Sequence, residues 1–569
     1  MPHQAKHDIK TKLRKARSTG RGKALFIIII ILILSLAGSG WYYWNNHKKR
    51  LIRETLESAV HEKTAGLYLL RYDSLNLDEV AGDLSVKNIR LVYDSLKFHA
   101  LQQTKDAPSI LLHLEIESID VSGVKTPRAL IDNEIVGKKI HIRNPSIQII
   151  YTGEGKDSAR VVPNEEIYKQ ILGDLNMIQV DTVEISGAHI ITKTLKTGKE
   201  NIQLKNASIR LMDVAVDSVA SRDDSRLVFS KQIFLSAEKV SWTSDDNLYN
   251  FVSDSIVINT SDRSASAKDF LIKPTLGEDA FVKKLRAQDD RFDFSFGRIA
   301  IHNLDMPALF NERVTADSIH IRSASLNVYR DLSIPRDKRS RVGLYPHQML
   351  EKIPVPVTIK KIILPSAFVE YKERNPRTTR AGKVQFHNTY ATLTNVTNDK
   401  SAIKKNNILT VAINTRFMNM TPLRVVWQFY LAHPKGRFDV KGDLGSIRFA
   451  DVNIITEPMG PARLEEGKLN DLQFNMAGGD YNMNGTVKML YEDLKVSILE
   501  REKGTRKLDK KNVASIAANI MIKNSNPEKK KDDAKIITVQ TERDTNRSIF
   551  YFVWMSLFKG IKETVGIKK

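Results

Sequence analysis

Residues 66–91 read GLYLLRYDSLNLDEVAGDLSVKNIRL, and a related stretch, NLYNFVSDSIVINTSDRSASAKDFLI, occupies residues 247–272. Four residues recur between the two stretches at an offset of 181: Leu67, Tyr68, Asp73 and Ser74 return as Leu248, Tyr249, Asp254 and Ser255. Further along, the tetrapeptide IHIR at 140–143 recurs unchanged at 319–322. Self-similarity at a fixed period indicates an array in which each unit packs on its neighbour. The sequence therefore predicts two copies of a unit of about 180 residues.

Within the unit, apolar residues alternate with polar ones. The clearest runs are Leu84, Val86, Ile89 and Leu91, and then Ile140, Ile142, Ile147 and Ile149, which are interrupted by Asn144-Pro145-Ser146. A period of two indicates β-strands with one apolar and one polar face, a pattern typical of antiparallel sheets. We predict a mainly β protein, with an elongated, twisted antiparallel sheet built from the two repeats.

A sheet with one apolar face must cover that face. The candidates are a second sheet, helices or a ligand that is not protein. The sequence alone leaves all three open, and the choice between them decides the function.

Composition excludes several functions. The 569 residues are 41% hydrophobic, which is enough for a large core, and they include no cysteine, so disulfides and thiolate sites are absent. The net charge of +22 is concentrated in four short segments: residues 1–23 carry +7, 45–53 carry +4, 501–535 carry +6 and 559–569 carry +3. The β-rich body is nearly neutral and lacks the basic surface expected of a nucleic-acid-binding groove.

Residues 24–44, ALFIIIIILILSLAGSGWYYW, contain no charge and are long enough to cross a bilayer as a helix. Trp41, Tyr42, Tyr43 and Trp44 at one end form an aromatic belt suited to the membrane interface. The alternative is a cleaved signal peptide, with small residues at 37–39, but the apolar run exceeds an ordinary signal core. We expect a single-pass anchor, with the N-terminus cytoplasmic by the positive-inside rule. The bulk of the chain would then lie across the membrane, which in a Gram-negative bacterium is the periplasm.

The remaining segments complete the predicted organisation. A helix start at 163–166, a shorter equivalent at 346–350, and helix candidates at 45–65 and 509–524 predict a few short helices, some of them capping the sheet. From Gly467 the chain predicts three strands, separated near 478–480 and 490–494. In chain order, the predicted segments are a basic tail (1–23), a transmembrane helix (24–44), a juxtamembrane helix (45–65), repeat 1 (66–246), repeat 2 (247–382), a closing meander (383–500), a helix with a charged loop (501–547) and an amphipathic C-terminal helix (548–569).

The C-terminal segment includes SIFYFVWMSLF at 548–558, which is uncharged but too short to span a bilayer. Trp554 and Phe558, with lysines nearby, suit a helix that lies in a membrane interface or docks on a partner. The alternative is a helix that closes the end of the sheet.

No catalytic constellation is present in the sequence. Matches to SxxK at 236–239 and 401–404 and to KTG at 196–198 occur in the wrong order and without a third motif, and GxGxxG, P-loop and HExxH patterns do not occur. His141 and His320 occupy the same repeat position on the polar side of a strand, where a surface role is expected. We expect no enzyme activity, no metal site and no cofactor.

The order of the motifs resembles the AsmA-like family of the Bacteroidota type. The resemblance rests on the apolar run at 24–44, GLYLLRYDSLNLD at 66–78, LSVKNIRLVYDSL at 84–96, IHIRNPSIQIIY at 140–151 and the pattern GxLxxLxFxMxGGxYxMxGxVxMxYxDLKV from Gly467. It covers nearly all of residues 24–565. It implies an inner-membrane-anchored periplasmic protein whose sheet forms a groove with an apolar floor, and which moves phospholipid towards the outer membrane or supports envelope assembly.

We therefore expect a lipid-handling groove, with phospholipid acyl chains and the inner membrane as partners and with an outer-membrane or envelope protein possible at the C-terminal end. The expected lining is Leu84, Val86, Ile89, Leu91, Ile140, Ile142, Ile147 and Ile149, with Ile256, Ile258, Phe270, Ile319, Ile321, Leu326 and Val328 in the second copy. The alternative is a periplasmic scaffold or assembly factor whose sheets pack into a dry core and carry no lipid.

Overall fold

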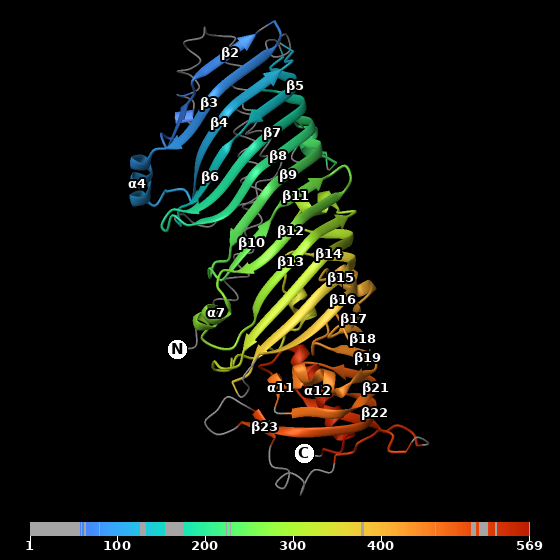
Figure 1. The fold of residues 1–569 in the computed structure, drawn as a ribbon. Helices are drawn as coiled ribbons and strands as arrows, with labels where there is room; N and C mark the ends of the chain where they lie inside the picture. Colours follow the sequence, from blue (N-terminus) through green and yellow to red (C-terminus); the bar gives the residue numbers. More distant parts are fainter. Residues whose placement is uncertain are drawn as a thin grey trace. The chain divides into compact units, whose positions relative to one another are not determined.

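The computed structural model describes residues 64–567 and residues 57, 60 and 61, with gaps at 79, 126–131, 154–171, 173–174, 224, 228, 377–380, 461, 502–507, 511–521 and 530–531. Strands make up 57% of the described residues, and 23 of these strands form one long mixed sheet with a few short helices (Figure 1). The prediction of a mainly β protein is confirmed. In the described part of the chain, no helix is both long and apolar enough to cross a membrane. The predicted span and its four aromatic residues lie outside the described residues.

The chain forms two compact units. Unit 1 contains the described residues up to Ser244 together with 251–269 and 302–313, and unit 2 contains 245–250, 270–301 and the residues from Val314 onward. Three strands, β10 (Tyr249–Ser253), β12 (Ser264–Pro274) and β13 (Arg291–His302), contribute residues to both units.

The other elements of unit 1 are β1 (Tyr68–Arg71), β2 (Ser74–Asp78), β3 (Asp83–Tyr93), α4 (Ser95–Thr104), β4 (Ile110–Ser122), β5 (Glu134–Arg143), β6 (Ser146–Tyr151), β7 (Met177–Thr194), β8 (Glu200–Val216), the 3-10 turn η2 (Ala220–Arg222), β9 (Ser230–Thr243), β11 (Ser255–Asn259) and α8 (Met306–Phe310).

The other elements of unit 2 are α7 (Glu278–Lys284), β14 (Val314–Asp331), α9 (Pro346–Glu351), β15 (Val357–Arg374), β16 (Gly382–Thr397), α10 (Lys400–Lys405), β17 (Ile408–Phe417), β18 (Thr421–Tyr430), β19 (Phe438–Leu444), β20 (Ile447–Arg448), the 3-10 turn η3 (Phe449–Val452), α11 (Asn453–Met459), β21 (Ala462–Gly478), β22 (Asn482–Arg501), β23 (Leu508–Lys510), β24 (Ile536–Glu542) and α12 (Ile549–Thr564).

Secondary structure recurs with the sequence repeat. Strands β1, β2 and β3 begin at Tyr68, Ser74 and Asp83, and β10, β11 and β12 begin at the same offset of 181 residues. Farther along the chain, α7 and β13 of the second copy correspond to α4 and β4 of the first. Later, β15 and β16 correspond to β7 and β8. The predicted duplication is therefore a duplication of elements in the same order.

The prediction of a wholly antiparallel sheet is wrong. Strands β5 and β6 both pair with β7 in parallel, and in unit 2 β14 pairs with β15 in parallel. Parallel neighbours require a connection that returns over a face of the sheet to the starting end. The connection 332–356, which contains α9, makes this return in unit 2, and we call it the crossover. Its predicted helix at 346–350 is confirmed.

Backbone bulges recur inside the long strands. Asn88, Asn206, Ser323 and Asn388 all have left-handed φ angles, of 53°, 48°, 53° and 49°. Register shifts mark the neighbouring pairings of β15, β16 and β17. A bulge bends a strand and increases its twist, and asparagine adopts the left-handed conformation more readily than most residues. These short polar residues interrupt the alternation of apolar and polar residues, and we infer that the strands bend at these positions.

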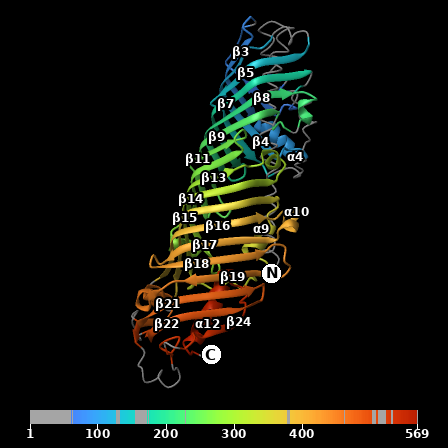
Figure 2. The ribbon, with the colours of Figure 1, turned by 90° about the vertical axis from the view of Figure 1, so that its right-hand side faces the viewer.

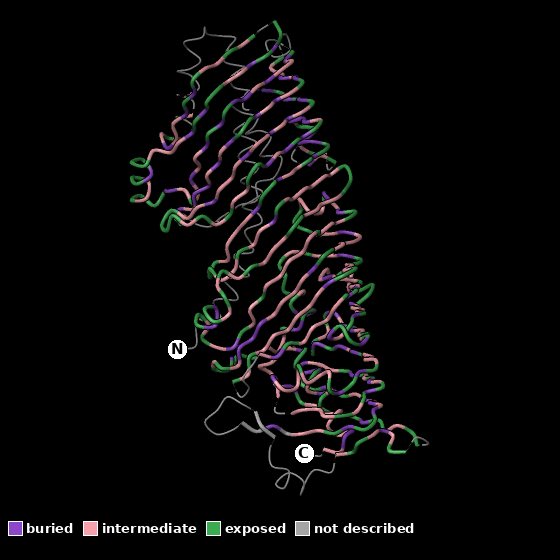
Figure 3. The backbone as a smooth tube through the Cα atoms, viewed as in Figure 1, coloured by how far each residue is buried: buried purple, intermediate pink, exposed green. Residues whose placement is uncertain are grey.

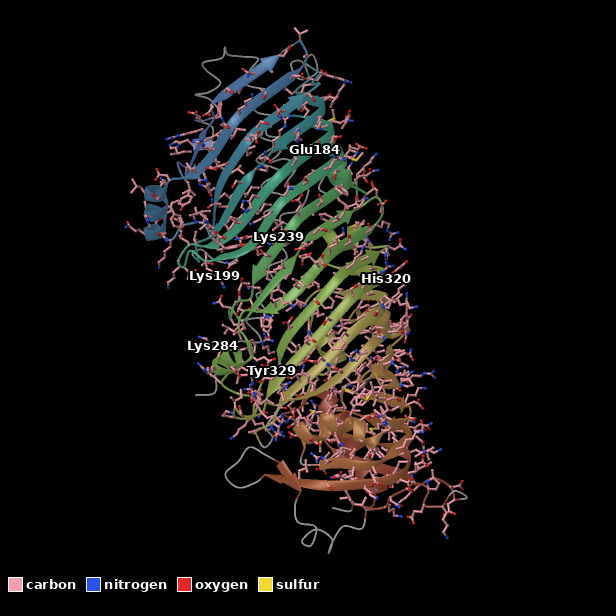
Figure 4. The ribbon with its side chains drawn as sticks, in the orientation of Figure 1. Glu184, Lys199, Lys239, Lys284, His320 and Tyr329 are labelled. Atoms are coloured by element: carbon pink, nitrogen blue, oxygen red, sulfur yellow. The ribbon has the colours of Figure 1, made fainter. Side chains whose placement is uncertain are left out.

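Alternation separates the two faces of unit 1. One cross-strand row is wholly buried, with exposures of 1–6%: Leu84, Val121, Ile140, Val183, Leu211 and Ile233. On the opposite face Glu184, labelled in Figure 4, bonds Lys139 at 2.6 Å and Arg210 at 3.0 Å. The hydrogen bonds from Lys139 and Arg210 lower the pKa of Glu184 to about 2. Ion pairs thus hold the strands together on the wet side.

Two further expectations require correction. Strand β22 continues through residues 490–494, where a break was predicted, because Asp493 adopts φ 56° within the strand and no turn forms. Helix α4 was not predicted; it begins after Asp94, whose carboxylate accepts hydrogen bonds from the amides of Leu96 and Lys97. Most of the predicted helices at 45–65, 163–175 and 509–524 lies outside the described residues.

Candidate functional site: the apolar face of unit 2

A single row of side chains crosses nine strands of unit 2 on one face. Directly paired residues on neighbouring strands point to the same side of a sheet, so the register defines the row without ambiguity. From β14 to β24 its members are Ile319, Ile362, Leu393, Val411, Trp427, Val440, Met476, Gly485 and Val539. We call this set the apolar row. Strands β14 to β19, which carry its first part, lie side by side in both ribbon views (Figures 1 and 2).

Burial changes along the apolar row. Its first four members, on β14 to β17, are partly exposed. Most of the later members are covered: Trp427 is 7% exposed, Val440 and Met476 are each 1% exposed and Val539 is fully buried, whereas Gly485 is partly exposed. The strands of the first segment are drawn mainly as intermediate in burial (Figure 3). The same apolar face is thus partly exposed over β14 to β17, where Val411 already packs against the covered core, and mostly covered from β18 onward.

A second row runs beside the first. On the early strands Leu364, Ile413 and Val425 are partly exposed and Ala391 is 7% exposed. On the late strands Phe474 is partly exposed, and Val487 and Ile537 are buried. The opposite side of these strands is mixed: Asn414 pairs with Arg424 and Thr410 with Gln428, and Ala412 pairs with Val426 between them. The apolar face of these early strands of unit 2 is therefore partly exposed.

Helix α12 closes the far end. It packs on β22 and β24, and a Cβ placed on Gly560 would lie 2.5 Å from Cγ2 of Val487, so only glycine permits this approach. The buried side of the helix joins a core cluster that also contains Phe438, Trp427 and Val440. Burial of this cluster removes apolar area from water and fixes the helix on the sheet.

The crossover covers the face next to α12. Tyr345 packs edge-on against Phe438 with ring centres 5.4 Å apart, and His347 lies 5.0 Å from the Phe429 ring. Both phenylalanines alternate in phase with Trp427, so the crossover runs over the apolar face. The side chain of Arg543, between β24 and α12, stacks 4.2 Å over Tyr345 and donates to the carbonyl oxygens of Asp480 and Arg341. These contacts clamp the crossover to the segment that begins α12.

A line of small, buried residues crosses strands β14 to β16. Ala324, Ala367 and Thr389 pair in succession across β14, β15 and β16, directly after bulges, and they are 4%, 4% and 6% exposed. The Thr389 hydroxyl lies 2.8 Å from that of Thr415 on β17. These three residues are therefore buried, whereas the larger apolar residues of the row on the same strands are partly exposed.

An ion-pair cluster stands at one end of β14 and β15. The Arg330 guanidinium binds both oxygens of Asp290 at 2.7 Å, and Lys372 bonds Glu278 on α7 at 2.7 Å. Burial raises the pKa of Tyr329, labelled in Figure 4, to about 12, with the nearby Asp331 adding to the effect. The charged side chains of this cluster pair with one another, and we assign the cluster a structural role in holding α7 on the sheet.

The predicted lining residues separate into two sets. In unit 1, seven of them are 0–6% exposed: Leu84, Ile89, Leu91, Ile140, Ile142, Ile147 and Ile149, and Val86 is partly exposed. The predicted members of the second copy are all partly exposed: Ile256, Ile258, Phe270, Ile319, Ile321, Leu326 and Val328. Of this second set, Ile256 and Ile258 belong to unit 1, and Ile319 is a member of the apolar row of unit 2.

Sequence reasoning missed Trp427, Phe429 and Phe438, which mark where the open face ends. The alternation of Val425, Trp427 and Phe429 was a signal for a strand with a large apolar side. It gave no indication that the crossover, about 80 residues earlier in the chain, packs there. His141, expected at the surface, lies 2.9 Å from the Ser186 hydroxyl on the polar face.

Comparison with known proteins provides no family: no model of a protein family matches the sequence, and no curated protein matches it. Within the described residues, no group of three or more His, Asp or Glu side chains is arranged to hold a metal ion. The geometry of the apolar face is therefore the basis for a function.

We predict that His347 makes the closed end sensitive to acid. Its ring is 1% exposed, and neither nitrogen has a hydrogen-bond partner among the described residues. Burial lowers the pKa of His347 to about 4, with Asp480 opposing and His433 reinforcing the shift. The folded state favours the neutral ring, so the stability it contributes is complete above about pH 6.5 and is lost as pH falls towards 4.

His347→Leu should flatten the decline in unfolding free energy between pH 7 and pH 5, as measured by urea denaturation. His99→Leu, on the exposed side of α4, is the control and should keep the wild-type slope. An H347L variant with the wild-type pH dependence would contradict the assignment.

We also predict that Gly560→Val displaces α12, at a cost of about 1–3 kcal/mol from overpacking against Val487. Limited proteolysis and Trp fluorescence should report a loosened C-terminal helix. Gly460→Val is the matched control, because its backbone is extended and a Cβ there makes only an ordinary 3.5 Å contact. Equal behaviour of the two variants would show that α12 does not depend on this close approach.

Proposed function

We propose that this protein holds phospholipid acyl chains on the apolar face of its sheet and carries them between membranes of the cell envelope. The proposal is supported by the partly exposed segment of the apolar row on β14 to β17, beside a continuation in which Trp427, Val440, Met476 and Val539 are buried. An extended apolar surface that is partly exposed is favourable for hydrocarbon and unfavourable for water.

The dimensions suit an acyl chain. Four interstrand steps from β14 to β18, at about 4.8 Å each, give about 19 Å. One leaflet of a bilayer provides about 15 Å of hydrocarbon, half of the roughly 30 Å core. A chain lying across these strands would meet Ile319, Ile362, Leu393 and Val411 in succession before reaching Trp427.

The energetics suit carriage without chemistry. Shielding one methylene from water is worth about 0.8 kcal/mol, so four shielded methylenes contribute about 3 kcal/mol. The lining consists of similar aliphatic side chains, so the energy changes little as a chain slides along it. Holding and sliding are then compatible, and no catalytic residue is needed.

The setting remains part of the proposal. A single span at residues 24–44 would anchor the chain in the inner membrane and place the sheet in the periplasm, as in the AsmA-like proteins that the sequence resembles. Outer-membrane lipid homeostasis would be the corresponding role, with a further envelope protein at the C-terminal end.

The alternative, a scaffold or assembly factor without lipid, has its own support. In unit 1 the row from Leu84 to Ile233 is buried, and the far end of unit 2 is a filled core. If the open segment of unit 2 is also covered by protein, the scaffold is the better description.

Photocrosslinking tests the proposal directly. A benzophenone amino acid at Val411, on the apolar row, should yield lipid adducts by mass spectrometry when the full chain is irradiated in its native membranes. The same label at Asn414, exposed on the opposite face of β17, should yield none. Absence of lipid at Val411, or equal recovery from both positions, would support the scaffold instead.

A charge on the row should release the lipid. Leu393→Asp removes apolar contact from about two methylenes, worth about 1.6 kcal/mol, so lipid retained through purification should fall roughly tenfold. Thr394→Asp, the next residue on β16 and on its polar face, should retain the wild-type amount. Quantitative lipid analysis of the purified chains measures both, and equal retention by the two variants would count against binding on the row.

A further inference from the structure

Helix α12 has an exposed stripe opposite the face that packs on the sheet. Ile549, Phe552, Val553 and Ser556 are buried, whereas Phe550, Tyr551 and Trp554 are 66%, 37% and 53% exposed. Phe558, one turn further on, is 39% exposed and stacks on Trp554 with ring centres 5.8 Å apart. Large aromatic side chains therefore occupy the outward side of a helix whose other side already secures it.

Cations stand at both ends of this aromatic stripe. Arg547, just before the helix, lies 5.2 Å from the Tyr551 ring, and Lys562 lies 5.2 Å from the Phe558 ring. Tyr and Trp favour the boundary between hydrocarbon and headgroups, and Lys and Arg favour anionic headgroups. The order cation, aromatics, cation along one side of a helix fits a helix lying in the plane of a membrane surface.

The stripe also begins where the open apolar row ends. Phe550 meets Trp427 edge-on with ring centres 5.9 Å apart, and Trp427 is the first covered member of the row. An apolar surface thus continues from the sheet onto the helix.

We propose that the exposed aromatic stripe of α12 docks the C-terminal end of this protein on the surface of an anionic phospholipid membrane. The aromatic rings enter the headgroup boundary while Arg547 and Lys562 contact headgroup phosphates. The docking stands independently of lipid carriage; only the passage of lipid between this membrane and the apolar row rests on the proposed function.

The absence of cysteine permits a site-specific test on the full chain. A single cysteine replacing Phe550, at the start of the stripe, is labelled with the environment-sensitive fluorophore NBD, and the chain is held in nanodiscs. Phosphatidylglycerol vesicles should shift the emission to the blue and raise it at least about twofold, and phosphatidylcholine vesicles should change it much less. A label at position 219, where Val219 is 78% exposed in unit 1, is the control and should not respond.

Two variants separate the contributions while the labelled position is kept. Trp554→Ser with Phe558→Ser should weaken vesicle binding at least about tenfold, because the aromatic contact is lost. Lys562→Gln should weaken it about fivefold for phosphatidylglycerol, with little effect on any residual binding to phosphatidylcholine. The three substituted side chains and the labelled position 550 lie on the outward side or at the end of the helix, so circular dichroism and proteolysis should match the wild type.

No response at position 550, an equal response at 550 and 219, or undiminished binding by the serine variant would overturn the proposal, and the first of these is the result expected if the stripe binds a protein. Photocrosslinking at Val411 is read separately. Lipid adducts there without vesicle docking would remove this inference and leave the proposed function intact.

Discussion

The apolar side of an alternating sheet has to be kept from water, and this constraint governs the whole structure. Each strand that alternates apolar and polar residues adds another row of aliphatic side chains to the same face. Water on that face costs roughly 25 cal/mol for every Å² of apolar surface left exposed. Over β18 to β24 of unit 2, helix α12 and the crossover cover most of this face. Over β14 to β17 the described residues leave the face partly exposed, and this difference is the basis for the function proposed.

The closed end depends on interactions between segments far apart in the chain. Arg543 stacks on Tyr345 of the crossover and also donates to the backbone of the β21–β22 turn at Asp480. Gly560 lets α12 approach Val487, and Phe438 receives the edge of Tyr345. The apolar face is partly exposed before Trp427 and mostly covered from Trp427 onward. Trp427 therefore marks one end of the proposed binding surface.

Much of the fold was predictable because the relevant signals are local. The period of two in Leu84, Val86, Ile140 and Ile142 specified strands and one apolar face, and the recurrence of IHIR at 319–322 specified a second copy. The parallel pairs were missed, although a helix between two strand runs is the usual mark of a crossover connection. The extent of burial was out of reach, since it depends on contacts such as Tyr345 with Phe438 that no local pattern encodes. Equivalent repeat positions consequently differ: Ile140 is 2% exposed, and Ile319 is partly exposed.

The most direct measurement is an experimental density map of the full chain purified with its native lipids. If lipid is carried on this face, we expect tubular density running across β14 to β17 along Ile319, Ile362, Leu393 and Val411 and ending at Trp427. Density from the protein's own side chains over these four residues, with no room for hydrocarbon, would contradict this expectation and identify the protein as a scaffold.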